Sequence, residues 1–516
     1  MSPGILIIRA DATAAIGHGH VMRCLALAQA WQDRDGECVF AVSKPLPAIE
    51  KRLNAEGCEV FEVAAQPGSH EDAREIAELA EQKAAQWVLA DGYHFGIEYQ
   101  QVLKSAGLKL LLVDDYGQIA AHAADIVLDQ NAGARQSFYE SRGPGTQLLL
   151  GTRYTMLRRE FRVWREWKRE IPEVARKILV TMGGSDPENL TARVIQALEK
   201  LLGRDLAIIV VIGSGNQRRA ELQELASRSK SGLRLQVDVA NIPDLMAWAD
   251  IAVSSASSTC WEMCLVGLPM IVTDAARNQQ ELACEIQSRE IGIQIPAARF
   301  TPSVVARDLA SLLADSRLRS HMSTRARALV DGRGSERVIA AMRAHDFTLR
   351  RVADGDCRLL WEWTNDSQVR RASFASATIS WEEHRRWFNR KINDDQCRWL
   401  IFSNQEAAAV VRIEMTSATD AEIGMTVASK FRSQGLAPYF LQRAVQQVFT
   451  TSSLDRLHAR IKPDNPASLA AFEGSGFVLV GTTVVRDQGA LHYIFEREGC
   501  RADATVHQCP VAAEAV

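Results

Sequence analysis

The chain has 516 residues, of which 47% are hydrophobic and 24% charged, and 60 Lys and Arg against 63 Asp and Glu give a net charge of -3. This length predicts three or four domains, and the balanced charge disfavours a nucleic-acid surface or a polybasic membrane anchor. No run reaches the ~18 apolar residues of a membrane span, and the N-terminus lacks the features of a signal peptide. The 10 cysteines have no metal-ligand or disulfide spacing, so we expect a cytoplasmic protein with reduced thiols and no metal.

The first 155 residues alternate short apolar runs with helical segments. The runs that predict strands are 5–9, 38–42, 60–63, 87–90, 110–113 and 126–128. Such alternation is typical of a parallel sheet with crossover helices. We therefore expect residues 1–155 to form one Rossmann-like α/β half.

A charged and aromatic stretch, 157–177, has no strand pattern and predicts a helical connector. The alternation then resumes, with strand-like runs KILVTMG, AIIVVIG, LRLQVDV, DIAVSS, PMIVTD and GIQI. We expect residues 156–345 to form a second Rossmann-like half that faces the first across a cleft. Ligands of open parallel sheets bind beyond the carboxyl ends of the strands, which places the expected site in that cleft.

The pattern changes from Phe347 onward. A strand (FTLRRV), a Trp-rich helical region, three antiparallel strands, a helix, a strand, a helix and a final strand pair predict an α+β domain over residues 346–498. Residues 499–516 have weak periodicity and predict a loose tail.

A glycine-rich loop with a histidine follows the first strand. Asp11, Gly17 and Gly19 precede His20 and the helical segment that contains Arg23. Glycines permit a tight turn, a helix N-terminus favours phosphate, and a histidine near neutral pH can act as a base. The alternative interpretation is a tight turn with a surface histidine.

The pattern R-x-D-A-x-x-x-I-G-x-G-H-V-M-R-C-L-A-L-A from Arg9 onward resembles the N-terminal signature of the UDP-sugar hydrolases of pseudaminic acid biosynthesis. The motifs DGYHF (91–95), VDD (113–115) and GGSDPENLT (183–191) extend this resemblance over residues 4–345. Members release UDP from UDP-2,4-diacetamido-2,4,6-trideoxy-β-L-altropyranose and share the two-domain fold of glycosyltransferase-B enzymes.

The resemblance implies that His20 is the general base that activates water, with His18 as the competing candidate. Asp11 is a candidate to orient His20 or to contact the sugar, unless it caps the turn. Tyr93, at a strand end, is expected to face the substrate. Arg23 is expected to meet the diphosphate, the alternative being a surface ion pair.

A second loop predicts nucleotide recognition. The pattern S-T-x-x-E (258–262)…G-x-P…N-Q resembles the UDP-binding end of the same folds, although Ser255, Ala256 and Ser257 stand where many relatives have glycines. The residues that the resemblance implies for UDP and sugar binding are Gly184, Ser185, Ser258, Thr259, Glu262, Asn278 and Gln279. An ordinary N-cap with an acidic first turn is the alternative.

A third loop, R-x-x-G-x-A from Arg432 to Ala437, and N-x-x-S-x-x-x-F from Asn465 to Phe472 resemble the paired motifs of GCN5-related N-acetyltransferases (GNAT). The acetyl-CoA residues that this resemblance implies are Val427, Arg432, Gln434, Gly435, Ala437, Asn465 and Ser468. Phe472 replaces a tyrosine that protonates the leaving thiolate in many relatives, and phenylalanine has no proton to donate. Glu422 and Glu414 are the candidate bases, the alternative being solvated strand faces, and His384 and His458 are weaker candidates.

Together these motifs predict a bifunctional enzyme that acetylates the 4-amino group of a UDP-sugar with acetyl-CoA and then releases UDP. The alternatives are a glycosyltransferase, a hydrolase for a related legionaminic-type UDP-sugar, and a C-terminal domain that only binds or assembles. The sequence predicts neither a nucleic-acid nor a membrane partner, and it leaves the oligomeric state open.

Overall fold

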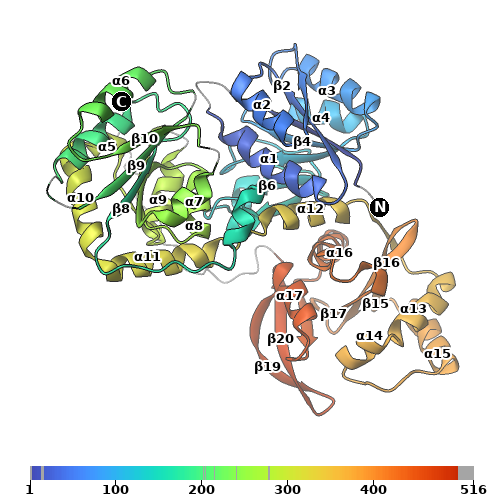
Figure 1. The fold of residues 1–516 in the computed structure, drawn as a ribbon. Helices are drawn as coiled ribbons and strands as arrows, with labels where there is room; N and C mark the ends of the chain where they lie inside the picture. The colour runs from blue at the N-terminus through green and yellow to red at the C-terminus, as the bar shows by residue number, and fades with distance from the viewer. Residues whose placement is uncertain are drawn as a thin grey trace, which may run out of the picture. The chain divides into compact units, whose positions relative to one another are not determined.

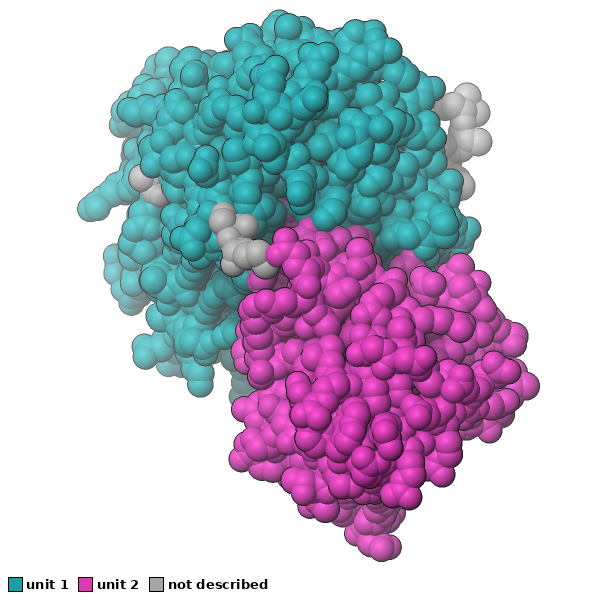
Figure 2. All heavy atoms as spheres, turned by 90° about the vertical axis from the view of Figure 1, so that its right-hand side faces the viewer, with its two compact units in different colours: residues 1–339 teal, residues 340–516 magenta. Residues whose placement is uncertain are grey.

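The structure, a computed structural model, describes residues 3–12, 17–201, 203, 205–213, 215–239, 241–276 and 279–497. The chain divides into two compact units, residues 1–339 and residues 340–516 (Figure 2). The predicted tail, 499–516, lies outside the described residues. Among the described helices, none combines the length and apolar character needed to cross a membrane.

The first unit begins with a seven-stranded sheet of order β3-β2-β1-β4-β5-β6-β7, in which all pairs are parallel. Its strands are β1 (Ile5–Ala10), β2 (Glu37–Val42), β3 (Glu59–Glu62), β4 (Trp87–Asp91), β5 (Lys109–Val113), β6 (Ile126–Asp129) and β7 (Gln147–Leu150). Its helices are α1 (Gly19–Gln32), α2 (Pro47–Ala55), α3 (His70–Gln82) and α4 (Ile97–Ser105). The six predicted strands are confirmed, and the short edge strand β7 was not predicted.

The second half of this unit has a six-stranded parallel sheet of order β10-β9-β8-β11-β12-β13, the doubly wound Rossmann order. Its strands are β8 (Lys177–Thr181), β9 (Ala207–Ile212), β10 (Arg234–Val237), β11 (Ile251–Ser255), β12 (Met270–Thr273) and β13 (Gly292–Gln294). The helices packed around this sheet in Figure 1 are α5 (Leu190–Glu199), α6 (Arg219–Arg228), α7 (Ile242–Trp248), α8 (Thr259–Leu265), α9 (Gln280–Ser288), α10 (Pro302–Ala314) and α11 (Ser316–Leu329). The next helix, α12 (Gly334–Ala344), lies beside β6 of the first half. All six predicted strands are confirmed.

The connector between the two sheets is mostly not helical, which corrects the sequence prediction. Only Arg159–Trp164 form a short 3-10 helix. Beyond it, Arg169 donates to the carbonyl groups of Val266 (3.0 Å) and Met246 (2.6 Å), so the connector is held by side-chain bonds to the second half rather than by its own helical bonds. Pro172 also removes a backbone donor that a helix would need.

The second unit contains a mixed seven-stranded sheet of order β14-β15-β16-β17-β18-β20-β19, in which β17 and β18 are parallel and the other pairs antiparallel. Its strands are β14 (Thr348–Arg351), β15 (Cys397–Asn404), β16 (Glu406–Met415), β17 (Asp420–Val427), β18 (Arg456–Ile461), β19 (Val478–Val485) and β20 (Gln488–Glu496). Its helices are α13 (Cys357–Thr364), α14 (Ser367–Ala372), α15 (Trp381–Ile392), α16 (Ala437–Thr451) and α17 (Pro466–Gly474). The fold is thus α/β, with two Rossmann-like sheets followed by a mixed-sheet domain.

Candidate active sites

The first glycine-rich loop joins β1 to α1. Gly17 has φ of +81°, a left-handed conformation that side chains disfavour, which accounts for glycine at this position. Helix α1 begins at Gly19, so His20 lies in its first turn, at the carboxyl end of the first sheet, with 8% of its surface exposed.

His20 is oriented by a carboxylate from another strand. Its Nδ1 lies 2.6 Å from Oδ1 of Asp91, the last residue of β4. Burial acts to raise the pKa of Asp91, but the charges of Arg23 and His20 outweigh it and hold that pKa well below its usual value. An ionised Asp91 fixes the proton on Nδ1, so Nε2 carries the lone pair that can accept a proton from a ligand.

Arg23 completes the support of His20. Its Nε and Nη2 donate to the two oxygens of Asp91 (2.6 and 2.7 Å), and Nη1 donates to Asp115 (3.0 Å). Asn131 in turn donates to Asp115 at 2.7 Å. Arg23 is 8% exposed, so of the two sequence interpretations the structure shows the ion pair, in a buried rather than a surface form. Asp91 and Asp115 had no assigned role in the sequence analysis, although both belong to its motifs.

Tyr93 lies beside His20. The rings meet edge to face, with centroids 5.3 Å apart, and the Tyr93 hydroxyl lies 3.5 Å from Oδ2 of Asp115. The side chain is 40% exposed, so it borders the histidine from the solvent side and remains a candidate substrate contact.

Asp11 does not orient His20, which corrects one of its predicted roles. Its Oδ1 accepts from the backbone N–H (2.8 Å) and hydroxyl (2.9 Å) of Ser43 and pairs with Arg9 at 2.7 Å. Burial acts to raise the pKa of Asp11, and Arg9 outweighs it and lowers that pKa. The described contacts of Asp11 therefore stabilise the start of the loop.

The same loop approaches the second sheet through His18. A Cβ placed on Gly184, in the turn after β8, would lie 3.0 Å from Nδ1 of His18, and one on Gly215 would lie 3.6 Å from Nε2. The histidine ring thus packs against Gly184 and Gly215, which have no side chains. Burial lowers the pKa of His18, against the opposing charge of Asp238, so this imidazole favours its neutral form.

The two glycine- and serine-rich loops come together at the starts of α1 and α8. A Cβ on Gly19 would lie 3.7 Å from Oγ of Ser258, the N-cap residue of α8. Thr259 is the first residue of that helix, and Glu262 lies in its first turn. Oε1 of Glu262 accepts from Nη2 of Arg158 at 2.9 Å, which fixes the carboxylate.

Three further residues were predicted to contact the nucleotide or the sugar, and the structure describes two of them. Ser185 is partly exposed in the turn that holds Gly184. Oε1 of Gln279 accepts from the backbone N–H of Ala275 at 2.9 Å, so this side chain shapes its own loop. Asn278 lies outside the described residues.

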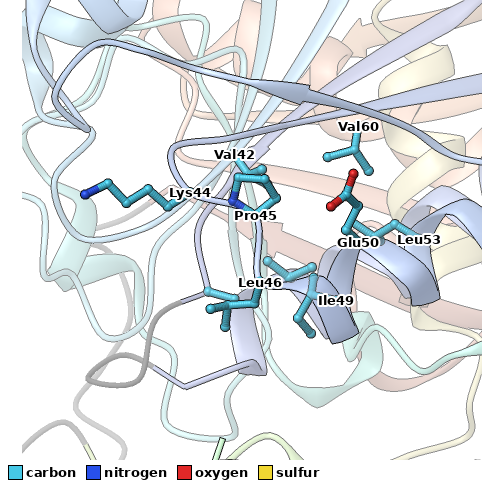
Figure 3. A pocket seen from close by; sticks show the side chains of 10 residues that line it. Val42, Lys44, Pro45, Leu46, Ile49, Glu50, Leu53 and Val60 are labelled. Atoms are coloured by element: carbon cyan, nitrogen blue, oxygen red, sulfur yellow. The ribbon is translucent and has the colours of Figure 1, made fainter. Parts of the chain in front are cut away.

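A small apolar cavity lies between β2 and α2 (Figure 3). Its lining includes Val42, Leu46, Ile49 and Leu53, and its volume is ≈ 10 Å³. This is about one water molecule, so the cavity does not hold a sugar.

The third predicted loop, between β17 and α16, has the shape of an anion cradle. Ser433 (φ +59°) and Gly435 (φ +74°) are left-handed, and α16 begins at Ala437. Among the described residues no acceptor bonds the backbone N–H groups of Gln434, Gly435 and Leu436. Consecutive N–H groups before a helix suit a pyrophosphate.

Two side chains of this loop, Arg432 and Gln434, form hydrogen bonds within the protein that stabilise the loop. Nη1 of Arg432 donates to Asp366 (2.9 Å) and Gln368 (2.8 Å). Oε1 of Gln434 accepts from Arg343 at 2.9 Å. The backbone N–H of Arg432 also donates to the carbonyl of Ser429 at 3.3 Å, so of these two residues only Gln434 keeps a backbone N–H for the predicted cofactor contact.

The parallel strands β17 and β18 separate beside this loop. Their pairing ends at Glu422 and His458, although β17 continues to Val427 and β18 to Ile461. Val427 pairs with Ala409 on its other side. The gap leaves an unpaired edge of β17, where an amide-containing arm such as pantetheine can add backbone-type hydrogen bonds.

Asn465 and Ser468 begin α17 at the far side of this gap. The Asn465 side chain caps the helix by accepting from the N–H of Ser468 (3.2 Å) and donates to its hydroxyl (2.9 Å). Phe472 is 4% exposed and packs edge to face on Phe477. Glu422 forms an ion pair with Arg460.

The comparisons with known proteins agree with this architecture. Residues 178–337 match the model of the glycosyltransferase family 28 C-terminal domain, and residues 346–478 match that of the acetyltransferase (GNAT) domain. The chain therefore joins a nucleotide-sugar-processing, glycosyltransferase-B-like region to a GNAT-type acetyltransferase domain.

Individual relatives show how far the similarity extends along the chain. The chain is a homologue of the UDP-2,4-diacetamido-2,4,6-trideoxy-beta-L-altropyranose hydrolase of Campylobacter jejuni, with 28% identity over 54% of this chain and 94% of the hydrolase. It is 23% identical to an uncharacterized protein of Methanocaldococcus jannaschii over 92% of this chain and 96% of that protein. The crystal structure of Acinetobacter baumannii MurG covers 66% of this chain and 99% of its own, at 15% identity and a TM-score of 0.46.

Proposed function

We propose that residues 1–339 hydrolyse UDP-2,4-diacetamido-2,4,6-trideoxy-β-L-altropyranose, or a UDP-sugar closely related to it, to UDP and the free sugar. The observation that carries this proposal is the hydrogen bond between His20 and Asp91 beside the start of α8. This bond lies next to the predicted nucleotide loop and supports His20 as the base. The similarity to the hydrolase of Campylobacter jejuni supports the same reaction.

In the proposed mechanism Nε2 of His20 takes a proton from water as the water oxygen bonds to C1 of the sugar. The bond between C1 and the phosphate oxygen breaks, and its electron pair leaves with UDP. Asp91 stabilises the imidazolium that forms, and Arg23 holds Asp91 in place. Ser258, Thr259 and nearby N–H groups would stabilise the leaving diphosphate, while Glu262 would accept from the ribose.

We propose that residues 340–516 use acetyl-CoA to acetylate the 4-amino group of the UDP-sugar that precedes this hydrolysis. The free N–H groups before α16 and the separated strands β17 and β18 fit the pyrophosphate and pantetheine of CoA. The match of residues 346–478 to the GNAT family supports this choice.

The test is an NMR time course of the whole protein with the 4-amino UDP-sugar, with and without acetyl-CoA. We expect acetylated free sugar and UDP only when acetyl-CoA is present. UDP release that requires an added sugar acceptor would contradict the hydrolase assignment. Absence of CoASH with this amine would contradict the acetyl acceptor.

A further inference from the structure

Three side chains form a hydrogen-bonded row on the third sheet, at the point where β17 and β18 separate. Nε2 of His458 lies 3.0 Å from Oδ1 of Asp420, and Nδ1 of His458 lies 3.0 Å from Nε2 of His492. The two rings stack with centroids 5.2 Å apart. Both nitrogens of His458 are used, which leaves Nδ1 of His492 as the nitrogen of this row that can accept a proton from a ligand.

The strand registers place this row on a defined face of the sheet. His458 is paired with Glu422, and His492 with Arg460. The neighbouring residues on β18, Leu457 and Ala459, are buried on the opposite face. Directly paired residues share a face, so Glu422, His458, Arg460 and His492 form one polar surface around the separation of the strands.

This polar surface lies on the same face of the third sheet that α15 covers at β15. Trp399 of β15, which packs on Trp387 of α15 with ring centroids 5.0 Å apart, is paired with Arg412. Arg412 is paired with Gly424, two residues after Glu422 on the same face of β17. The polar surface is therefore the uncovered part of that face, next to the gap proposed for pantetheine.

The row is arranged to carry a proton. Oδ2 of Asp420 accepts from the hydroxyls of Thr419 (2.8 Å) and Ser417 (2.9 Å), and Arg456 pairs with Oδ1 at 2.8 Å. The hydrogen bond from His458 holds the pKa of Asp420 well below its usual value. A charged Asp420 places the His458 proton on Nε2, so Nδ1 of His458 accepts from His492.

His492 is held neutral near physiological pH. Burial lowers the pKa of its imidazole, and the nearby charge of Arg460 lowers it further. The other strand beside His492 contributes Gly481, which has no charge. The charged groups near the row are thus Asp420 and Arg456 at one end and Glu422 and Arg460 at the other.

We propose that Nδ1 of His492, coupled through His458 to Asp420, removes the proton from the ammonium group of the acceptor in acetyl transfer. This inference rests on the proposed acetyltransferase function. The freed amine attacks the thioester carbonyl, the new N–C bond forms and the C–S bond breaks. The second amine proton passes to the leaving thiolate to give CoASH, and the proton on His492 returns to solvent. Glu422 forms an ion pair with Arg460.

The test compares the wild type with His492→Gln, Asp420→Asn and Glu422→Gln, using acetyl-CoA and the 4-amino UDP-sugar between pH 6 and pH 10. His70→Gln, an exposed histidine of the first unit, is the matched control. We expect His492→Gln to lower kcat/KM for the amine about 10²-fold at pH 7, with CoA affinity unchanged. Because amines lose their proton unaided at high pH, this deficit should shrink about tenfold per pH unit.

A second readout does not depend on turnover. In 15N NMR of histidine side chains, His458 and His492 should titrate together in the wild type, and Asp420→Asn should shift both. A His492→Gln variant with wild-type rate and pH profile would overturn the proposal, and a pH-dependent loss confined to Glu422→Gln would assign the base to Glu422. A wild type that binds CoA but does not acetylate the amine would instead contradict the proposed function.

Discussion

Nδ1 of His20 and Oδ1 of Asp91 lie 2.6 Å apart, although 71 residues separate them in the sequence. The pair joins the first turn of α1, which follows β1, to the end of β4. The parallel sheet places β1 and β4 side by side. Asp91 also accepts from Arg23, so the carboxylate is fixed from two directions. This geometry defines the tautomer of His20 and hence the base of the proposed hydrolysis.

Replacing Asp91 with asparagine should test how Asp91 orients His20 without unfolding the protein. Asp91→Asn keeps the size of the side chain but loses the charge that fixes the His20 tautomer, so kcat for UDP release should fall about 10³-fold. The measurement is UDP release by a coupled assay, with acetyl transfer as the folding control. An unchanged kcat would contradict the role of Asp91, and Asp33→Asn, at a partly exposed ion pair with Arg162, should have no effect.

Glu262 should recognise the ribose. Arg158 holds its carboxylate, which is proposed to accept from a ribose hydroxyl. Glu262→Gln should therefore weaken UDP binding about tenfold, a loss of about 1.4 kcal/mol, and reduce discrimination against 2′-deoxy-UDP. Calorimetric titration with both nucleotides measures this, and equal discrimination in wild type and variant would contradict it.

The contact between His18 and Gly184 should limit the size of residue 184. Gly184→Ala places a methyl group 3.0 Å from Nδ1 of His18, so the loop must shift and UDP release should fall about tenfold, of order 1.4 kcal/mol. Gly145→Ala is the matched control, because nothing lies within 4 Å of its new Cβ.

A double mutant sharpens this test. Adding His18→Ala to Gly184→Ala removes the steric conflict, so the two effects should not add. Additive losses of UDP release would show that the methyl group acts through something other than His18.

The stability of the first unit should depend on Glu285 of α9. Burial raises the pKa of Glu285 to about 7, against the opposing effect of Arg289, and its Oε2 accepts from the Tyr116 hydroxyl at 3.3 Å. The folded state then binds a proton that the unfolded state has lost, so the free energy of unfolding should fall as pH rises from about 4.5 to about 7.

Glu285→Gln removes this titration and should raise the free energy of unfolding by about 2 kcal/mol at pH 8 relative to its effect at pH 4. Denaturant unfolding at both values measures the difference. The exposed Glu224→Gln serves as control, and a Glu285→Gln effect that is equal at pH 4 and pH 8 would refute the assignment.

The strands of the two parallel sheets could be predicted because they are continuous buried runs of Val, Ile and Leu between turn residues. The short β7 and the connector could not. β7 has four residues at a sheet edge, and the connector takes its shape from distant carbonyl groups that Arg169 reaches. Such long-range side-chain bonds leave no periodic pattern in the sequence.

The sequence motifs included His20, Tyr93 and Asp91, but Asp11 rather than Asp91 was predicted as the candidate acid to orient the histidine. Asp11 lies nearer in sequence, whereas Asp91 reaches His20 because β1 and β4 are neighbours. The row from Asp420 to His492 was missed for a similar reason. It depends on the register of three strands, which local patterns do not define.

The most direct test of the central claim is the His20→Ala variant of the whole protein, incubated with the 4-amino UDP-sugar and acetyl-CoA and followed by 1H and 31P NMR. We predict that the acetylated UDP-sugar accumulates intact while CoASH forms at the wild-type rate. Release of UDP at the wild-type rate would contradict the assignment of His20 as the base.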